Sequence, residues 1–210
     1  MSEPTDHYFS AEPATPEERR TIEVALEGRR LTLTTARGVY SPDRLDPGTA
    51  VLLAGVPDPS PTGELLDIGC GWGPIAITLT LRSPGARVWG VDVNRRSLDL
   101  ARANASAAGV GAIRFCEPDE VPDDVRFDTI WSNPPIHVGK AALHALLERW
   151  LLRLSDDGVA YLVVQRHLGS DSLQKWLNAQ PWGLTCTRLS SAKAFRILEV
   201  RRGGDAAVSR

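Results

Sequence analysis

Asn133, Pro134 and Pro135 are the residues of this chain with the clearest chemical potential, and they directly follow a predicted strand at 127–131. Two consecutive prolines block both strand and helix, so they hold the backbone in a stiff extended turn. The Asn133 side chain and the Pro134 carbonyl would then point outward at the carboxyl end of the strand, where open α/β sheets bind ligands. Both groups can accept hydrogen bonds, and two converging acceptors suit a planar amine with two N–H donors. Asn-Pro also occurs in ordinary turns, so this motif by itself does not identify a binding site, and further motifs are needed to support it.

The second motif is a Gly-x-Gly-x-Gly loop at 69–73, which follows a short apolar strand at 65–68. Pro74 stands at the first turn of the next predicted helix, a position where proline is tolerated. Dinucleotide sites use a similar glycine loop, but their spacing is G-x-G-x-x-G. Asp67 also precedes the first glycine, where it would repel a pyrophosphate but could hold an ammonium group. The loop therefore favours a ligand with a positive end over a dinucleotide.

A carboxylate follows the next predicted strand. The apolar segment 88–91 ends at Asp92, and a carboxylate at this place can bind both hydroxyls of a ribose. The implied ligand has a ribose and a positive, amino-acid-like end, and it has no phosphate. S-adenosylmethionine fits this description.

With these motifs in this order, the chain resembles the class I methyltransferases. It is most similar to the small-domain family typified by the guanine-N2 methyltransferases of small-subunit ribosomal RNA. The segments that carry the resemblance run from His7 to Arg201: His7-Tyr8-Phe9-Ser10, Gly38-Val39-Tyr40-Ser41, Asp46-Pro47-Gly48-Thr49, Asp67 to Gly73, Val91-Asp92-Val93-Asn94 and Asn133 to Ile136. Two departures stand out. The best-known members carry a degenerate second copy of the domain, for which 210 residues leave no room, and the residue after Asn-Pro-Pro, often aromatic in amine methyltransferases, is Ile136.

The resemblance implies a role for each matching residue. The catalytic loop would be Asn133, Pro134, Pro135 and Ile136. S-adenosylmethionine would be bound by Asp46, Thr49, Asp67, Gly69, Cys70, Gly71, Gly73, Asp92, Val93, Asn94 and Asn133. An acidic residue after the third strand would contact the adenine ring, and Asp119 is slightly preferred to Glu117. The acceptor base would need an aromatic platform, for which Tyr8, Phe9 and Tyr40 are the candidates, and Tyr40 is the best of them because it lies in a segment that matches the family. Lys140 could meet a phosphate.

The order of elements agrees with the fold that the resemblance implies. Segments 22–26 and 30–34 alternate at period two around Glu27-Gly28 and predict a hairpin. Thr49 is expected to cap a short helix, and strand and helix patterns then alternate from Leu65 onward, which is typical of a parallel sheet with crossover helices. The predicted helices and strands that follow are a helix after Asn94 that ends at Gly109, a helix at 140–154, a strand at 159–165, a helix around 173–177 and an antiparallel pair at 184–189 and 195–201.

We therefore expect an α/β, Rossmann-like class I methyltransferase fold. Its seven-stranded sheet should be mostly parallel, with helices on both faces, an antiparallel C-terminal strand and an N-terminal β-hairpin. The expected organisation is a flexible arm at 1–20, one methyltransferase domain at 21–202 and a flexible tail at 203–210.

Composition restricts the class of protein. The chain has 42% hydrophobic and 24% charged residues, as in ordinary globular domains. It shows no apolar run long enough for a membrane span and no signal peptide, so we expect a cytoplasmic protein with no membrane contact. The three cysteines and four histidines show no metal-binding spacing, so no metal site is expected.

The net charge of −2 argues against a protein that coats nucleic acid non-specifically. The charge is uneven, because residues 1–20 hold five acids and two arginines whereas residues 186–210 hold six basic residues and two acids. A local basic face is therefore possible, formed by Arg188, Lys193, Arg196, Arg201 and Arg202. The expected partner is ribosomal RNA or the small ribosomal subunit.

The expected reaction is methyl transfer to an exocyclic amine of a base, with guanine-N2 of small-subunit ribosomal RNA as the leading acceptor. Hydrogen bonds to Asn133 and Pro134 would favour a tetrahedral nitrogen and aim its lone pair at the sulfonium methyl group. Adenine-amine methylation and methylation of a protein glutamine amide use the same type of loop and remain alternatives. A nicotinamide-dependent oxidoreductase is disfavoured by Asp67, and a non-enzymatic cofactor- or RNA-binding protein is disfavoured by the intact loops.

Overall fold

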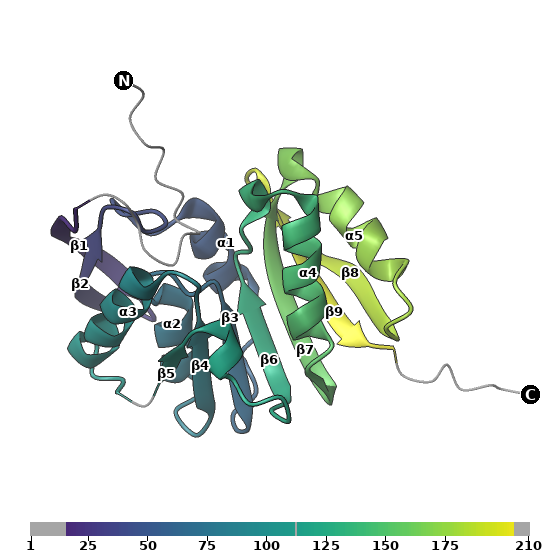
Figure 1. Cartoon of the computed structure of the whole chain (residues 1–210), viewed down its shortest axis with the longest axis horizontal. Coiled ribbons are helices and arrows are strands. Elements are labelled where there is room, and N and C mark those ends of the chain that lie inside the picture. The colour runs from purple at the N-terminus through teal and green to yellow at the C-terminus, as the bar shows by residue number, and fades with distance from the viewer. Residues whose placement is uncertain (1–15, 112, 204–210) are drawn as a thin grey trace, which may run out of the picture.

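A twisted seven-stranded sheet with helices on both faces forms the body of the computed structural model, which describes residues 16–111 and 113–203 (Figure 1). The strand order is β5-β4-β3-β6-β7-β9-β8. The strands are β3 (Glu64–Ile68), β4 (Arg87–Val91), β5 (Arg114–Cys116), β6 (Phe127–Ser132), β7 (Leu154–Gln165), β8 (Leu184–Ala192) and β9 (Phe195–Arg202). Strands β3 to β7 pair in parallel, and β9 is antiparallel to both β7 and β8. The predicted sheet is confirmed.

Two apolar cores lie on the two faces of this sheet. One core packs beneath α1 (Pro47–Gly55), α2 (Pro74–Arg82) and α3 (Arg95–Ala107), and the other beneath α4 (Lys140–Leu151) and α5 (Ser170–Asn178). The central strands are apolar throughout because both of their faces are covered. Neighbouring residues of β3 show this, since Leu65 belongs to the first core and Leu66 to the second.

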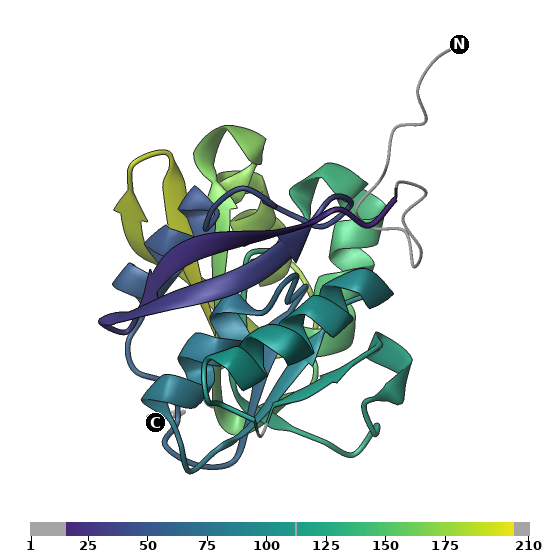
Figure 2. The same cartoon turned by 90° about the vertical axis from the view of Figure 1, so that its left-hand side faces the viewer.

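The N-terminal hairpin consists of β1 (Arg19–Leu26) and β2 (Arg29–Ala36) and forms a separate two-stranded sheet. Its turn at Glu27 and Gly28 has positive φ at both residues, the backbone that two-residue hairpin turns need. The hairpin lies across α3 (Figure 2), where the Asn104 side chain bonds both backbone groups of Thr34. The predicted hairpin is confirmed, and it begins at Arg19, just inside the segment that was expected to be irregular.

Several local predictions hold and two need correction. Helix α3 is followed by Gly109 at positive φ, as expected for a helix stop. The helix predicted at 140–154 ends at Leu151, and Leu154 already belongs to β7. The N-cap of α1 is Asp46 and not Thr49, because Asp46 Oδ1 accepts the Thr49 backbone N–H at 3.0 Å.

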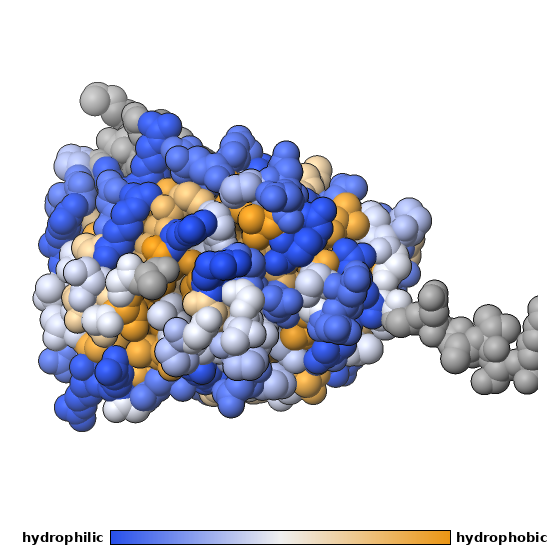
Figure 3. Space-filling model, turned by 90° about the horizontal axis from the view of Figure 1, so that it is seen from below, coloured by the Kyte–Doolittle hydropathy of each residue, from blue (hydrophilic) through white to orange (hydrophobic). Residues whose placement is uncertain are grey.

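The ends of the central strands are aligned at one edge. Ile68 pairs with Val91 of β4 and with Ser132 of β6, so these three strands end in register. The residues that follow them, Gly69, Asp92 and Asn133, therefore start three neighbouring loops. At the opposite edge, hydrophilic and apolar residues are interspersed on the surface (Figure 3). Within the described part of the chain, no helix is long and apolar enough to cross a bilayer.

Candidate active site at the carboxyl edge of the sheet

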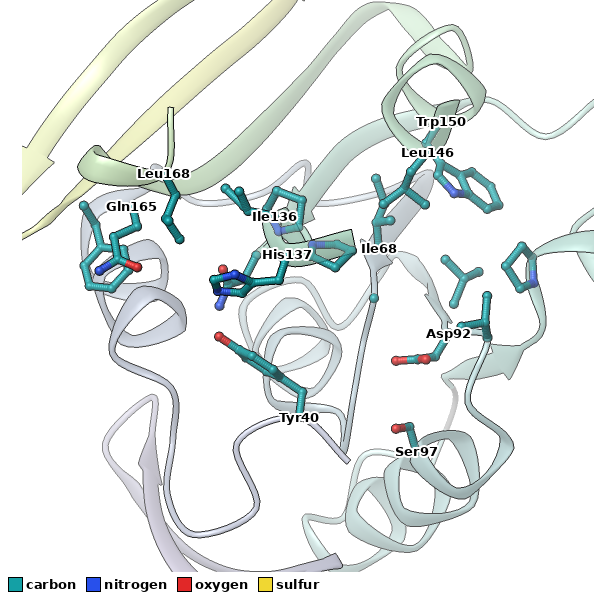
Figure 4. A pocket seen from close by; sticks show the side chains of 18 residues that line it. Tyr40, Ile68, Asp92, Ser97, Ile136, His137, Leu146, Trp150, Gln165 and Leu168 are labelled. Carbon is teal, nitrogen blue, oxygen red and sulfur yellow. The ribbon is translucent and has the colours of Figure 1, made fainter. Parts of the chain in front are cut away.

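Two adjoining cavities occupy this edge. The main cavity is lined by Tyr40, Ile68, Gly69, Val91, Asp92, Val93, Ser97, Pro118, Asn133, Pro134, Pro135, Ile136, His137, Leu146, Trp150, Gln165, Leu168 and Phe195. The side cavity is lined by Tyr40, Ser41, Asp46, Thr49, Gly69, Cys70, Gly71, Trp72, Pro74, Ile75 and Asn133. Tyr40, Gly69 and Asn133 line both. In Figure 4, Asp92 and Ser97 lie on one side of the main cavity, Gln165 and Leu168 on the other, and Tyr40 and His137 between them.

The glycine loop leaves open space for a ligand. Gly69 and Gly71 have φ of 70° and 53°, and a Cβ added to either would meet no atom within 4 Å. Gly73 is different, because a Cβ there would lie 3.2 Å from that of Ala101. Gly69 and Gly71 thus keep space open beside the cavities, whereas Gly73 permits close packing of α3 against the loop.

Asp92 faces the main cavity and also holds the loops together. Its carboxylate accepts the backbone N–H of Gly71 and of Asn94, both at 2.9 Å. Burial raises the pKa of the Asp92 carboxyl, and the backbone N–H groups oppose part of this rise. A carboxylate has room for further donors. It is therefore suited to the two hydroxyls of a ribose.

Asp67 lies behind the glycine loop and is fully buried. One oxygen accepts the Ala76 N–H of α2 at 3.0 Å, and Oδ1 has no partner among the described residues. Burial raises the pKa of the Asp67 carboxyl well above its ordinary value, and the negative charge of Asp92 adds to the rise. An unsatisfied buried acceptor is costly. A positive ligand or a bridging donor would relieve that cost, so the residues present fit the amino-acid end of S-adenosylmethionine.

The Asn133 amide is held in one orientation. Its nitrogen donates to Asp46 Oδ1 at 2.7 Å and to Thr49 Oγ1 at 3.1 Å. A carboxylate can only accept, so the amide nitrogen must face Asp46. The amide oxygen has no hydrogen-bond donor among the described residues, and it remains available to accept one from a ligand.

Asp46 is the centre of this arrangement. Besides Asn133 it caps α1 through the Thr49 N–H, and its other oxygen accepts from the Tyr40 hydroxyl at 2.9 Å. Gly48 allows the close packing, because a Cβ there would lie 2.9 Å from both Asp46 Oδ1 and the Phe195 ring. The resemblance placed Asp46 and Thr49 with the cofactor residues; both line the side cavity, and both accept from the Asn133 amide.

Several other expected residues lie away from the cavity lining. Asn94 is buried, caps α3 through the Ser97 N–H and donates to the Gly38 carbonyl. Asp119 forms an exposed ion pair with Arg149, and Glu117 pairs with Arg95. Of that segment only Pro118 lines the main cavity, and neither Glu117 nor Asp119 lines either cavity. Lys140 is exposed at the start of α4. Tyr8 and Phe9 lie outside the described residues.

Four residues that sequence reasoning missed also line the main cavity. They are His137, Gln165, Leu168 and Phe195. Gln165 ends β7 and pairs with Phe195, the first residue of the antiparallel strand β9. The rule that ligands bind beyond the carboxyl ends of parallel strands could have identified Gln165. Nothing in the local sequence points to Phe195.

The expected basic face near the C-terminus is largely neutralised. Arg188 and Arg196 share Asp171, and Arg201 pairs with Glu199. Arg202 donates to the carbonyls of Leu152 and Leu154. The four arginines of the expected basic face therefore have partners within the protein, and Lys193 is its fifth member.

No group of three or more metal-binding side chains occurs among the described residues. The Cys70 thiol lines the side cavity, and burial together with two nearby carboxylates raises its pKa well above the ordinary value. It is therefore a neutral thiol and a poor nucleophile. Neither a metal centre nor thiol chemistry is indicated here, and the cavity is suited to a small organic ligand.

Comparison with known proteins agrees with this reading of the cavity. A family model described as the methyltransferase small domain matches residues 30–199. The uncharacterized protein YbxB of Bacillus subtilis (strain 168) is 30% identical over 171 residues, covering 80% of this chain and 85% of that protein. The ribosomal RNA small subunit methyltransferase C of Aeromonas hydrophila is 36% identical over 128 residues, covering 60% of this chain and 36% of that protein.

Among solved structures, the Thermus thermophilus 16S rRNA N2 G1207 methyltransferase (RsmC), in complex with AdoMet and guanosine, superposes with a TM-score of 0.76 and 25% identity. The alignment covers 89% of this chain and 51% of that one. The chain thus spans between about a third and a half of the length of these two named methyltransferases. It belongs to the methyltransferase small domain family, and its fold is that of an S-adenosylmethionine-dependent methyltransferase.

Proposed function

We propose that this protein transfers a methyl group from S-adenosylmethionine to the exocyclic N2 amine of a guanine in small-subunit ribosomal RNA. The observation that carries the proposal is the fixed orientation of Asn133. Its nitrogen is engaged by Asp46 and Thr49, so its oxygen is available for an N–H of the acceptor. The names of the Aeromonas and Thermus relatives support guanine in ribosomal RNA as the acceptor.

An exocyclic base amine is a poor nucleophile because its lone pair is delocalised into the ring. In the proposed mechanism, its two N–H groups donate to Asn133 Oδ1 and to the Pro134 carbonyl. These bonds favour a tetrahedral nitrogen and direct its lone pair toward the methyl group. S-adenosylmethionine supplies the activated methyl group, so the protein's contribution is positioning, which can supply roughly 7–11 kcal/mol of a barrier.

The main cavity offers space and apolar surface for a base. A base within folded RNA must be unstacked to reach Asn133, and flipped bases are usually held by stacking against aromatic or apolar side chains. Tyr40 lines the cavity and is 39% exposed. It is the proposed platform, and its bond to Asp46 couples the platform to the catalytic loop.

The decisive experiment is transfer of a tritiated methyl group to three substrates, namely naked ribosomal RNA, assembled small subunits and protein fractions. Nucleoside analysis of labelled RNA should identify N2-methylguanosine. Label in N6-methyladenosine would identify adenine as the acceptor, and label in a glutamine side chain would identify a protein amide. Both acceptors are alternatives because the residue after Asn-Pro-Pro is Ile136. Asn133→Ala should abolish transfer while cofactor affinity, measured by calorimetry, stays within about threefold. Full activity in that variant would refute the amine-methyltransferase mechanism.

A further inference from the structure

Two exposed cations that the catalytic proposal does not use lie beside residues that line the main cavity. Arg166 follows Gln165 at the end of β7, and Lys193 lies in the turn between β8 and β9. The two segments are adjacent, because the Arg166 N–H donates to the Ala194 carbonyl at 2.7 Å. Gln165, Leu168 and Phe195 line the cavity. Arg166 therefore directly follows one residue that lines the cavity, and Lys193 lies two positions before another.

Among the described residues, neither Arg166 nor Lys193 forms an ion pair with a carboxylate, in contrast to the arginines of β8 and β9 that share Asp171. Both residues are exposed to solvent. Because the whole chain carries a net charge of −2, attraction of a polyanion must come from a local pair of this kind.

The backbone of Lys193 gives an independent reason to look here. Its φ is 53°, in the left-handed region where glycine or asparagine is the ordinary choice. A side chain in this region crowds the following carbonyl oxygen, which strains the backbone. Glycine adopts this backbone without strain, so Lys193→Gly removes the side chain without adding strain to the turn.

We propose that Arg166 and Lys193 bind the phosphates that flank the target nucleotide and so dock single-stranded or looped RNA at the cavity mouth. This inference rests on the proposed function. A base that reaches Asn133 has its sugar-phosphate chain near the opening, where these two side chains are exposed. The neighbouring Leu168, 38% exposed, adds an apolar contact beside them. The cation pair supplies affinity and position but no selectivity among bases, because phosphate contacts carry no direct sequence information.

The test measures Arg166→Ala/Lys193→Gly and its two single variants. Arg126→Ala is the control for each single variant, because it likewise removes one positive charge. Arg126 is exposed and lies just before β6, at the opposite end of that strand from Asn133. The measurements are RNA binding as a function of salt, kcat and KM for RNA, transfer to free guanosine, and the melting temperature. Loss of two phosphate contacts should lower the slope of log affinity against log salt by about 1.4, since each contact to single strands contributes about 0.7.

We expect KM for RNA to rise at least tenfold in the double variant, with kcat and any transfer to free guanosine unchanged. The single variant Lys193→Gly should lower RNA affinity while keeping or raising the melting temperature, which a merely structural lysine would not do. A salt slope equal to that of the wild type, or an equal decrease in Arg126→Ala, would overturn the inference. If the wild type methylates a protein and no RNA, the proposed function itself fails.

Discussion

Replacing Asn133 by aspartate should test whether the orientation of its amide matters or only the presence of an oxygen. Asn133→Asp keeps an acceptor oxygen of similar geometry, so a mechanism that needs only an acceptor would tolerate it. The structure predicts otherwise. The new carboxylate would face Asp46 Oδ1, which now lies 2.7 Å from the Asn133 nitrogen, and it would lose both donated hydrogen bonds.

The expected loss follows from two effects. Two carboxylates about 4 Å apart repel by about 4 kcal/mol at an effective dielectric constant of 20. A hydrogen bond to a charged group contributes about 1.5–3 kcal/mol. Side-chain rotation and the partial exposure of Asp46 reduce this sum. We therefore expect a loss of about 3–4 kcal/mol in transition-state stabilisation, or a roughly 10²–10³-fold fall in kcat/KM.

The assay is single-turnover methyl transfer to RNA, with cofactor affinity from calorimetry and the melting temperature as controls. Adding Asp46→Asn to Asn133→Asp removes the repulsion, and the Thr49 hydroxyl can then rotate to donate to the new carboxylate. The rate of this double variant should be at least ten times that of Asn133→Asp alone. Asp46→Asn alone should lose less than tenfold, because asparagine caps helices about as well as aspartate. Near wild-type activity of Asn133→Asp, or no recovery in the double variant, would refute the role assigned to Asp46.

Three further predictions follow. Asp92→Ala should weaken S-adenosylmethionine binding about 10- to 100-fold in calorimetry, and the melting temperature should fall by a few degrees because two backbone N–H groups lose their acceptor; unchanged cofactor affinity would remove Asp92 from the site. The raised pKa of the Asp67 carboxyl means that the folded ligand-free chain binds its proton more tightly than the unfolded chain, so this group lowers stability as pH rises above about 4. Asp67→Asn should therefore lessen that decline and raise the ligand-free melting temperature at pH 7 while weakening cofactor binding, and an unaltered stability profile between pH 4 and 7 would contradict the assignment. Arg196→Ala should lower the melting temperature, because this largely buried side chain pairs with Asp171 and donates to Ser170. The salt slope of RNA binding should not change, and a smaller slope would show that Arg196 contacts RNA.

Most of the fold was predictable because its signals are local. Period-two alternation predicted the hairpin, and apolar runs between turn residues predicted the parallel strands. Errors of boundary arose where two local signals overlapped. Leu154 continues the helical stripe of α4, yet the chain has already turned into β7, because pairing with Phe127 of β6 decides its place.

The site residues divide in the same way. The glycine loop and the residues after β4 and β6 were visible in the sequence, since a strand end followed by glycine, carboxylate or Asn-Pro-Pro is a local pattern. The adenine contact was not visible in the sequence, because Glu117 and Asp119 look equivalent there. Only the folded structure shows that each of these side chains forms a surface ion pair.

By itself, the sequence determined the order of elements, the edge of the sheet at which the loops meet and the kind of ligand that the loops accept. Tertiary structure alone decided what the side chains do there. Asn133 and Asp46 are 87 residues apart, and their contact depends on how α1 packs against β7 and β9. The four arginines near the C-terminus have partners within the protein, while Arg166 and Lys193 stay exposed and form no ion pair among the described residues. Hydrogen-bond and ion-pair partners are chosen by distances across the folded chain, and no local pattern specifies those distances.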